Sequence, residues 1–380
     1  MRGHIKKRGR DTYSVIVSQG SDPATGRRRQ TWRTVRGSKR DAEAVLTQLL
    51  AQKDSGIDLP PGRVTIAVYL GRWLESYARP NTRPRTYESY ELLIRKHTLP
   101  LLGRLPLAKL APSHLQQLYA DRLRAGLSPM TVRHLHAVLH KAFGDAVTWG
   151  LAGRNVADAV SPPRAPRREI QTLSSEQARA FLDAASGDRL EALYVVALTT
   201  GMRQGELLGL PWSAVDLERG TVQVRGSLQR TRDNRPAIVE PKTPSSRRQV
   251  MLTRTATAAL RRHRTRQLEE RLRLGPAWNE SDLVFTSEIG TPLSATNLVR
   301  RSFRRLLERA GLPRIRFHDL RHTAATLLLG EGQHPKLVAD MLGHSRISTT
   351  LDLYSHTTPA MHREAAEVLD ALLGSGQGGR

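Results

Sequence analysis

Five short segments in the carboxyl-terminal half of the chain carry, in a set order, polar side chains suited to chemistry on a phosphate. Two arginines can hold the negative charge of a phosphate, while a lysine and two histidines can move protons. A tyrosine comes last and can serve as a nucleophile. This inventory suits the cutting and rejoining of a phosphodiester, and it requires a fold that brings distant segments to one site. In chain order the residues are Arg203, Lys242, His318, Arg321, His344 and Tyr354.

Breaking a DNA strand without a metal ion sets three requirements. Negative charge grows on the non-bridging oxygens as a fifth oxygen approaches phosphorus, so hydrogen-bond donors must be aimed there. The attacking hydroxyl must lose a proton, and the departing 5′ oxygen must gain one. If the phosphate stays on the enzyme, the bond energy is kept for rejoining and no ATP is needed.

Two of the segments pair a charged residue with a partner three positions away. Arg203 and Glu206 have this spacing, which predicts that they share a helical face and that Glu206 orients the guanidinium. A surface ion pair is the alternative. His318 and Arg321 have the same spacing, so Arg321 is predicted to reach the same phosphate while His318 takes or shares the tyrosine proton. A helix N-terminus with a satisfied histidine is the alternative for that pair.

The lysine and the tyrosine are less specific when each is taken alone. Lys242 is one of only two lysines after Lys141, in a chain with 51 arginines among 60 basic residues. We expect it in a turn between two strands, where it could protonate the leaving 5′ oxygen, because lysine can lose its proton and arginine effectively cannot. A solvated turn lysine is the alternative. Tyr354 lies among leucines, and a tyrosine in such a setting is more often a core residue than a nucleophile. His322 and His356 are further histidines to which no role is assigned.

The sequences that flank these residues resemble those of the tyrosine recombinases, the phage-integrase family. Gly-Met-Arg-Gln-Gly-Glu-Leu-Leu-Gly-Leu is similar to the first arginine box, and Phe-His-Asp-Leu-Arg-His-Thr-Ala-Ala-Thr to the His-x-x-Arg box. Leu-Gly-His-Ser-Arg-Ile-Ser-Thr-Thr through Leu-Tyr-Ser-His is similar to the box that carries the tyrosine. The resemblance is close over residues 172–372 and looser over residues 63–160. It implies catalytic roles for all six residues, with Tyr354 as nucleophile and no metal or nucleotide cofactor.

The charge of the chain predicts a polyanionic partner. Net charge is +25 and the isoelectric point is about 11.3, which makes nucleic acid the first candidate and an anionic membrane the second. No apolar run approaches the ~18 residues of a spanning helix, which argues against the membrane. The chain has no cysteine, so disulfides, thiolate metal sites and a thiol nucleophile are excluded. A cytoplasmic, nucleoid-associated location is expected.

Residues 1–55 are expected to form a small module of two strands and a helix. Tyr13, Val15 and Val17 alternate as in a half-buried strand, residues 30–36 read as a second strand, and Ser38 is a plausible N-cap. Twelve Lys or Arg against two acids in the first forty residues predict a DNA-binding element, with a solvated basic tail as the alternative. The family resemblance makes it an arm-binding domain. The expected DNA contacts are Lys6, Lys7, Arg8, Arg27, Arg28 and Arg29.

Residues 63–160 show four amphipathic helical stretches and resemble the family's helical core-binding (SAM-like) domain. Thr65 is expected to cap the first helix, whose inward residues are predicted to be Val68, Trp73, Leu74 and Tyr77. Residues 161–171 form a proline-rich linker. Its arginines are expected to lie along DNA phosphates, and they are Arg164, Arg167 and Arg168.

Residues 172–373 are expected to form the catalytic domain, and residues 374–380 a disordered tail. Ser174 and Gln177 form a capping box at its first helix. Three short strands are predicted at 221–224, 229–240 and 247–252. A short apolar helix near the chain end is expected to act between protomers, with docking in its own chain as the alternative.

The expected fold is therefore mainly α with small β-sheets, arranged as a three-domain tyrosine recombinase with a three-stranded sheet in its catalytic domain. The resemblance implies a site-specific recombinase of a phage or mobile element that acts on double-stranded DNA at core and arm attachment sites. It also implies a 3′-phosphotyrosine intermediate, a Holliday junction and a homotetramer on DNA, with a DNA-bending protein and an excisionase as further candidate partners. The alternatives are a non-catalytic DNA-binding protein, which would not need all six groups, and a type IB topoisomerase-like enzyme, against which the amino-terminal module argues.

Overall fold

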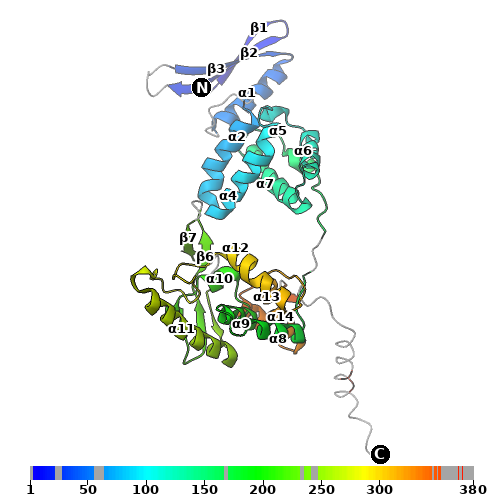
Figure 1. Cartoon of the computed structure of the whole chain (residues 1–380). Helices are drawn as coiled ribbons and strands as arrows, with labels where there is room; N and C mark the ends of the chain where they lie inside the picture. The colour runs from blue at the N-terminus through cyan, green and yellow to red at the C-terminus, as the bar shows by residue number, and fades with distance from the viewer. Residues whose placement is uncertain are drawn as a thin grey trace, which may run out of the picture. The chain divides into compact units, whose positions relative to one another are not determined.

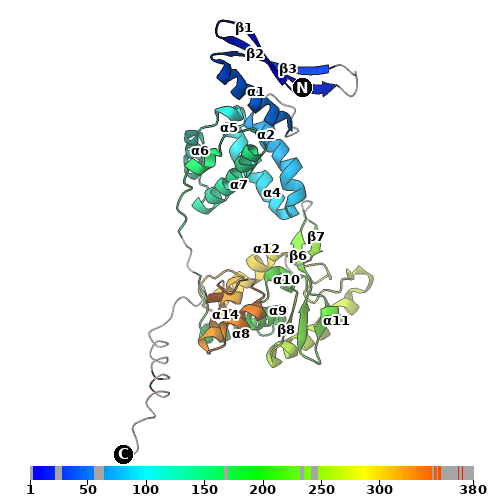
Figure 2. The same ribbon diagram turned by 180° about the vertical axis from the view of Figure 1, so that it is seen from behind.

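The structure, a computed structural model, describes residues 3–21, 28–54, 64–166, 170–231, 235–240, 247–344, 346–348, 350–351, 367 and 370. The chain divides into two compact units, Met1–Arg167 and Arg168–Arg380. The described part is mainly helical with small antiparallel sheets, which confirms the expected fold class (Figures 1 and 2). No described helix is both long enough and apolar enough to cross a membrane.

The amino-terminal module is a three-stranded antiparallel sheet with one helix packed on it. The strands β1 (Gly3–Gly9), β2 (Thr12–Ser21) and β3 (Arg28–Arg36) pair in that order, and α1 (Lys39–Asp54) contacts all three. The module therefore has one more strand than expected, because β1 is rich in basic residues and shows little apolar alternation. Ser38 caps α1 as expected: its Oγ accepts from the Asp41 backbone N–H at 3.3 Å.

The rest of the first unit is a helical bundle around one apolar core. Thr65 Oγ1 accepts from the Val68 N–H at 3.3 Å and so begins α2 as expected. Val68 itself is 45% exposed, contrary to the expectation, because the buried residues of α2 recur at 66, 69, 70 and 73 and leave position 68 outside. The elements are α2 (Ile66–Trp73), η1 (Leu74–Ala78), α3 (Arg79–Asn81), α4 (Pro84–Leu92), η2 (Leu93–Thr98), α5 (Leu99–Leu102), η3 (Leu107–Lys109), α6 (Pro112–Arg124), α7 (Pro129–Thr148) and η4 (Val156–Ala159).

The second unit surrounds a buried helix, α9 (Glu191–Thr200), which packs against α8, α10, α11 and α14. The predicted capping box is present before α8, since the Ser174 and Gln177 side chains each accept from the other's backbone N–H. The other helices are α8 (Ser175–Ala185), α10 (Gln204–Leu208), η5 (Trp212–Ala214), α11 (Arg254–Leu274), η7 (Gly275–Ala277), α12 (Ala295–Asn297), η8 (Leu298–Phe303), α13 (Arg304–Arg309), α14 (Asp319–Gly330) and α15 (Pro335–Leu342).

The sheets of this unit differ from the expected set. The three-stranded sheet consists of β4 (Val215–Asp216), β5 (Thr221–Val224) and β8 (Arg248–Met251), in that order. The single strand predicted at 229–240 is wrong, because the chain reverses between Thr231 and Arg235, where the Thr231 N–H donates to the Arg235 carbonyl at 2.9 Å. This reversal makes a separate hairpin of β6 (Ser227–Arg230) and β7 (Pro236–Val239).

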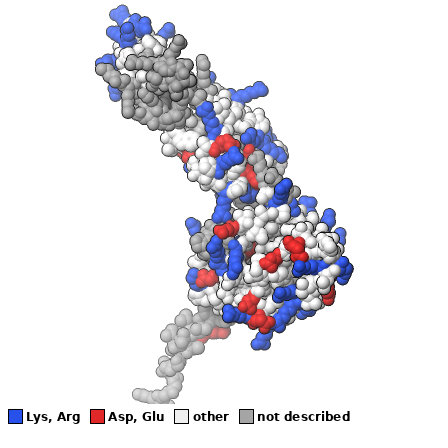
Figure 3. All heavy atoms as spheres, turned by 90° about the vertical axis from the view of Figure 1, so that its left-hand side faces the viewer, with Lys and Arg blue, Asp and Glu red and all other residues white. Residues whose placement is uncertain are grey.

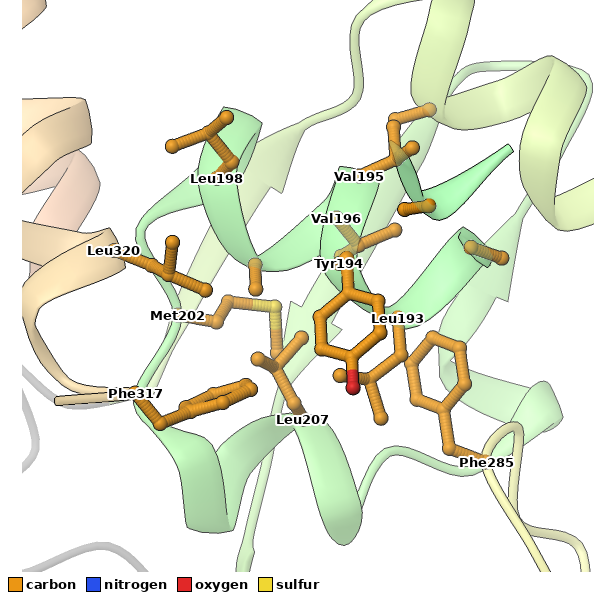
Figure 4. Close-up of a cluster of buried hydrophobic side chains, with 14 of the residues drawn as sticks. Leu193, Tyr194, Val195, Val196, Leu198, Met202, Leu207, Phe285, Phe317 and Leu320 are labelled. Carbon is orange, nitrogen blue, oxygen red and sulfur yellow. The ribbon is translucent and has the colours of Figure 1, made fainter. Parts of the chain in front are cut away.

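The core of the second unit is built from residues that adjoin the predicted catalytic positions. Met202 and Leu207 belong to the first arginine box, and Phe317 and Leu320 belong to the His-x-x-Arg box (Figure 4). All four side chains are buried in one cluster with α9 residues such as Leu193. Because interiors are close-packed, this shared core fixes the two boxes relative to each other.

Candidate active site

Arg203 stands at the start of α10 and holds the end of another helix. Its extended backbone makes it the N-cap of α10, so the predicted shared helical face with Glu206 is wrong, although the predicted pairing exists. Arg203 Nη1 donates to Glu206 Oε1 at 2.8 Å, and the Arg203 backbone N–H donates to Oε2 at 3.0 Å. Arg203 Nη2 donates to the carbonyl of Gly343 at 3.0 Å. Glu206 therefore orients the guanidinium, which at the same time reaches the residue before His344.

Glu206 is a buried carboxylate that serves two arginines. Arg248, from β8, donates through Nη2 to Oε2 at 2.9 Å and through Nη1 to Oε1 at 3.3 Å. Burial alone would raise the pKa of Glu206, but hydrogen bonds and charge from Arg248 and Arg203 outweigh it and lower that pKa. The carboxylate is therefore ionised at neutral pH and balances part of the positive charge of the site.

Arg321 is almost completely buried on α14, with 2% of its surface exposed. Its Nη1 donates to the carbonyl of Gly201 at 2.8 Å, while its Nη2 has no hydrogen-bond partner among the residues that the structure describes. Burial and the positive charges of Arg203 and Arg248 lower the pKa of Arg321 to about 9. The guanidinium is still charged at neutral pH, so it lies in a position that an anion would stabilise.

Gly201 lets the chain turn between α9 and Arg203. Its φ of +60° belongs to the left-handed region, and a Cβ at this position would overlap the Leu342 side chain. The same Cβ would lie 3.7 Å from Arg321 Cγ. The end of α9, Arg321 of α14 and the end of α15 therefore meet at this glycine.

His318 precedes α14 and lies against a second histidine. The ring centroids of His318 and His322 are 4.9 Å apart and their planes are nearly perpendicular. Burial, and then the charge of Arg321, lowers the pKa of His318, so the ring is neutral at physiological pH and able to accept a proton. Burial, and next the charge of His318, lowers the pKa of His322 to about 4.

The turn that carries His318 is held by an ion pair of its own. Arg316 Nη2 donates to Asp319 Oδ1 at 2.7 Å, and the Arg316 N–H donates to Oδ2 at 2.8 Å. Thr323 Oγ1 also accepts from the Leu173 N–H at 3.1 Å, which ties α14 to the start of the unit.

His344 follows Gly343, the C-cap residue of α15, which has a φ of +69°. Its Nδ1 lies 2.8 Å from Thr350 Oγ1. Burial, and then the charges of Arg321 and Arg203, lowers the pKa of His344 to about 4. A neutral His344 can donate one hydrogen bond without adding charge to an already positive site.

The structure thus brings together four of the six predicted catalytic residues: Arg203, Arg321, His318 and His344. Lys242 and Tyr354 lie outside the described residues, as do His356 and most of the apolar helix expected near the chain end. Among the described residues, no group of three His, Asp or Glu side chains could hold a metal ion.

Several of the basic residues proposed to contact DNA are exposed. Lys6, Lys7 and Arg8 are exposed on β1, and Arg164 is exposed in the linker. The side chains of Arg28 and Arg29 on β3 are not described, and Arg27, Arg167 and Arg168 lie outside the described residues. Basic side chains are spread widely over the face drawn in Figure 3.

Arg248 is the site residue that the sequence reasoning missed. It lies on the same face of β8 as Val250, which is buried in the core. An arginine at an inward-facing position of a strand needs a buried partner, and this was the available signal. The partner, Glu206, lies 42 residues away in the sequence, so no local pattern indicates the pair.

Comparison with known proteins places most of the chain in the family that the sequence motifs resemble. Residues 171–361 match the phage integrase family, and residues 65–123 match the N-terminal SAM-like domain of phage integrases. A protein of Caldanaerobacter subterraneus named tyrosine recombinase XerC-like is 32% identical over 385 residues, which cover 96% of this chain and 97% of that protein.

Two solved structures show where the fold recurs. The Tn1549 transposon integrase, solved with a circular intermediate DNA, has 25% identity and a TM-score of 0.69, over 80% of this chain and 99% of that one. A lambda integrase tetramer bound to a Holliday junction has 20% identity and a TM-score of 0.56, over 92% and 94% of the chains, and shows the fold. The chain belongs to the phage integrase family, and it is a DNA strand-transfer enzyme of the tyrosine recombinase type.

Proposed function

We propose that this protein is the site-specific integrase of a phage or another mobile element, which cuts and rejoins DNA through a 3′-phosphotyrosine at Tyr354. The observation that carries the proposal is the arginine pair. Arg321 is buried with one guanidinium nitrogen unpaired among the described residues, and Arg203 lies close enough to lower its pKa. A phosphodiester is an anion, and two guanidinium groups placed in this way can hold it by donating hydrogen bonds to its non-bridging oxygens.

The proposed chemistry assigns one task to each group. The Tyr354 oxygen attacks phosphorus, the bond to the 5′ oxygen breaks, and the tyrosine proton goes to His318. Arg203, Arg321 and a neutral His344 donate hydrogen bonds to the oxygens on which charge grows. Lys242 gives a proton to the departing 5′ oxygen.

Rejoining is the reverse of this step. The 5′ hydroxyl of the partner strand gives its proton to Lys242 and attacks phosphorus, the bond from phosphorus to the Tyr354 oxygen breaks, and His318 returns a proton to that oxygen. Exchange of one pair of strands and then of the other passes through a Holliday junction. The proposed assembly on core and arm attachment sites is a homotetramer on double-stranded DNA, aided by a DNA-bending protein and an excisionase.

The nucleophile is tested with a suicide substrate that carries a nick near the crossover point, so that the cut strand diffuses away and the covalent adduct accumulates. The parent protein should form an adduct that resists denaturation, and Tyr354→Phe should form none. Adduct formation by Tyr354→Phe would overturn the assignment. Arg203→Ala and Arg321→Ala should still bind the site but fail to cleave it, because both act mainly on transition-state charge.

The general acid is tested with a substrate that has sulfur in place of the bridging 5′ oxygen. A thiolate leaves without a proton, so this substrate should restore cleavage by Lys242→Ala but not by Arg203→Ala. If neither variant recovers, the proton-donor role of Lys242 is wrong.

A further inference from the structure

We propose that Arg248 is a positioning residue that holds Arg203 and His344 in one arrangement, by joining Glu206 to the end of α15. The proposal rests on the function proposed above. It concerns a residue that does not reach the phosphate and acts on the reaction through two residues that do.

Arg248 makes its first set of contacts with a carboxylate that it shares with Arg203. Glu206 accepts four hydrogen bonds, two from Arg203 and two from Arg248, at distances between 2.8 and 3.3 Å. The side chains of Arg248 and Glu206 are only 7% and 6% exposed. A buried carboxylate that loses one of two such partners must move to find new donors, and Arg203 would move with it.

Arg248 makes its second contact at the end of α15. The last carbonyl oxygens of a helix accept no hydrogen bond from within the helix, and here two arginines donate to carbonyl oxygens at this end. Arg248 Nε donates to the Met341 carbonyl at 2.8 Å, and Arg203 Nη2 donates to the Gly343 carbonyl at 3.0 Å. His344 is the next residue, so both arginines determine where its backbone leaves the helix.

The close fit around Gly343 supports the same reading. A Cβ at position 343 would lie 3.1 Å from both Cδ and Nη1 of Arg248, tighter than an ordinary van der Waals contact. The Arg248 side chain therefore lies along the turn that leads to His344. Both its hydrogen bonds and its packing fix that turn.

The geometry also explains why arginine is needed at position 248. One planar guanidinium donates through Nε to Met341 and through both Nη atoms to Glu206. A lysine ammonium is a single point on a flexible stem, so it cannot keep this set of bonds in place. Lysine keeps the positive charge beside Glu206, however, so Arg248→Lys separates geometry from charge.

The test compares Arg248→Lys with Arg247→Lys as a matched control. Arg247 is the adjacent arginine, but its side chain is 60% exposed and pairs with an exposed Glu240 at 3.0 Å. Adduct formation on the suicide substrate and affinity for the same DNA are measured for each full-length variant. Arg248→Lys should bind DNA like the parent and cleave on the order of 100-fold more slowly, the effect of a small misplacement of catalytic groups. Arg247→Lys should match the parent in cleavage.

A double-variant cycle identifies the path of the effect. If Arg248 acts through Glu206, then Glu206→Gln and the double variant should each be about as slow as Arg248→Lys, rather than slower by the product of the two effects. The sulfur-bridged substrate should not restore cleavage by Arg248→Lys. The defect of this variant lies in the groups that bind the non-bridging oxygens, and not in the transfer of a proton to the 5′ oxygen.

The proposal would be overturned by unchanged cleavage by Arg248→Lys, by a lower DNA affinity that accounts for the slower cleavage, or by recovery on the sulfur-bridged substrate. Multiplicative effects in the cycle would do the same. If Arg248→Lys fails to fold, Glu206→Gln alone must show slow cleavage with unchanged DNA binding for the proposal to stand. Absence of any adduct with the parent protein would instead refute the proposed function.

Discussion

Gly201→Ala should destabilise the second unit strongly, because this glycine has two separate reasons to lack a side chain. Its φ of +60° lies in the left-handed region, and a Cβ would overlap the Leu342 side chain at the end of α15. Its carbonyl also accepts the hydrogen bond from Arg321. The substitution therefore tests both the backbone and the packing at the centre of the site.

The expected magnitude is the sum of two terms. A residue with a Cβ in the left-handed region costs about 1–2 kcal/mol. Forcing an extra methyl into a packed core costs about 1–3 kcal/mol, since neighbours must shift. The free energy of unfolding of the second unit should thus fall by about 2–5 kcal/mol, and cleavage should slow because Leu342 and Arg321 must move.

Gly311→Ala is the matched control. Gly311 also has a positive φ, +65°, but a Cβ there would meet no atom within 4 Å. It should therefore show only the backbone term of about 1–2 kcal/mol. The difference between the two variants isolates the packing term.

Hydrogen exchange measured by mass spectrometry on peptides from α9 and α14 reports the opening free energy of this unit within the full chain. Equal losses for Gly201→Ala and Gly311→Ala would refute the packing argument. A loss below about 1 kcal/mol for Gly201→Ala would refute the backbone argument as well.

Three further predictions concern pH and the two ends of the chain. Burial lowers the pKa values of His322 and His344 from 6.5 to about 4, so the unfolded chain binds protons in this range that the folded chain does not. The Tm of the second unit should therefore fall as pH drops from about 6.5 towards 4; calorimetry should show a shallower fall after both histidines are replaced by Asn, and an unchanged slope would contradict the assignment. Deleting residues 1–55 should spare binding to the crossover site and abolish full integration, whereas an isolated 1–55 segment without sequence preference in competition binding would be only a basic tail. Truncation after Ser355 should leave half-site binding but prevent a synaptic tetramer, and tetramers of the truncated protein in light scattering would exclude a role between protomers.

Much of the local structure could be predicted because it depends on residues close in the sequence. The caps at Thr65 and at Ser174 with Gln177 are decided by side chains that reach their own backbone three residues away. The end of α9 at Gly201 follows from the conformational freedom of glycine. The sequence likewise predicts which residue types would carry the catalysis, because the chemistry of a phosphate demands them and their order matches that of a family.

The tertiary structure decided what depends on contacts between distant segments. No pattern in the neighbouring sequence predicts that Arg248 pairs with Glu206. The same is true of the short strand β4, which is a strand because it pairs with β5. The inward prediction for Val68 failed because the register of α2 against its neighbours decides which residues are buried. Arg203 meets Gly343 across a separation of 140 residues. Local sequence can specify the type of a side chain and the cap of a helix. Only the packed core, in which Met202 and Phe317 are buried together, specifies where one site side chain lies relative to another.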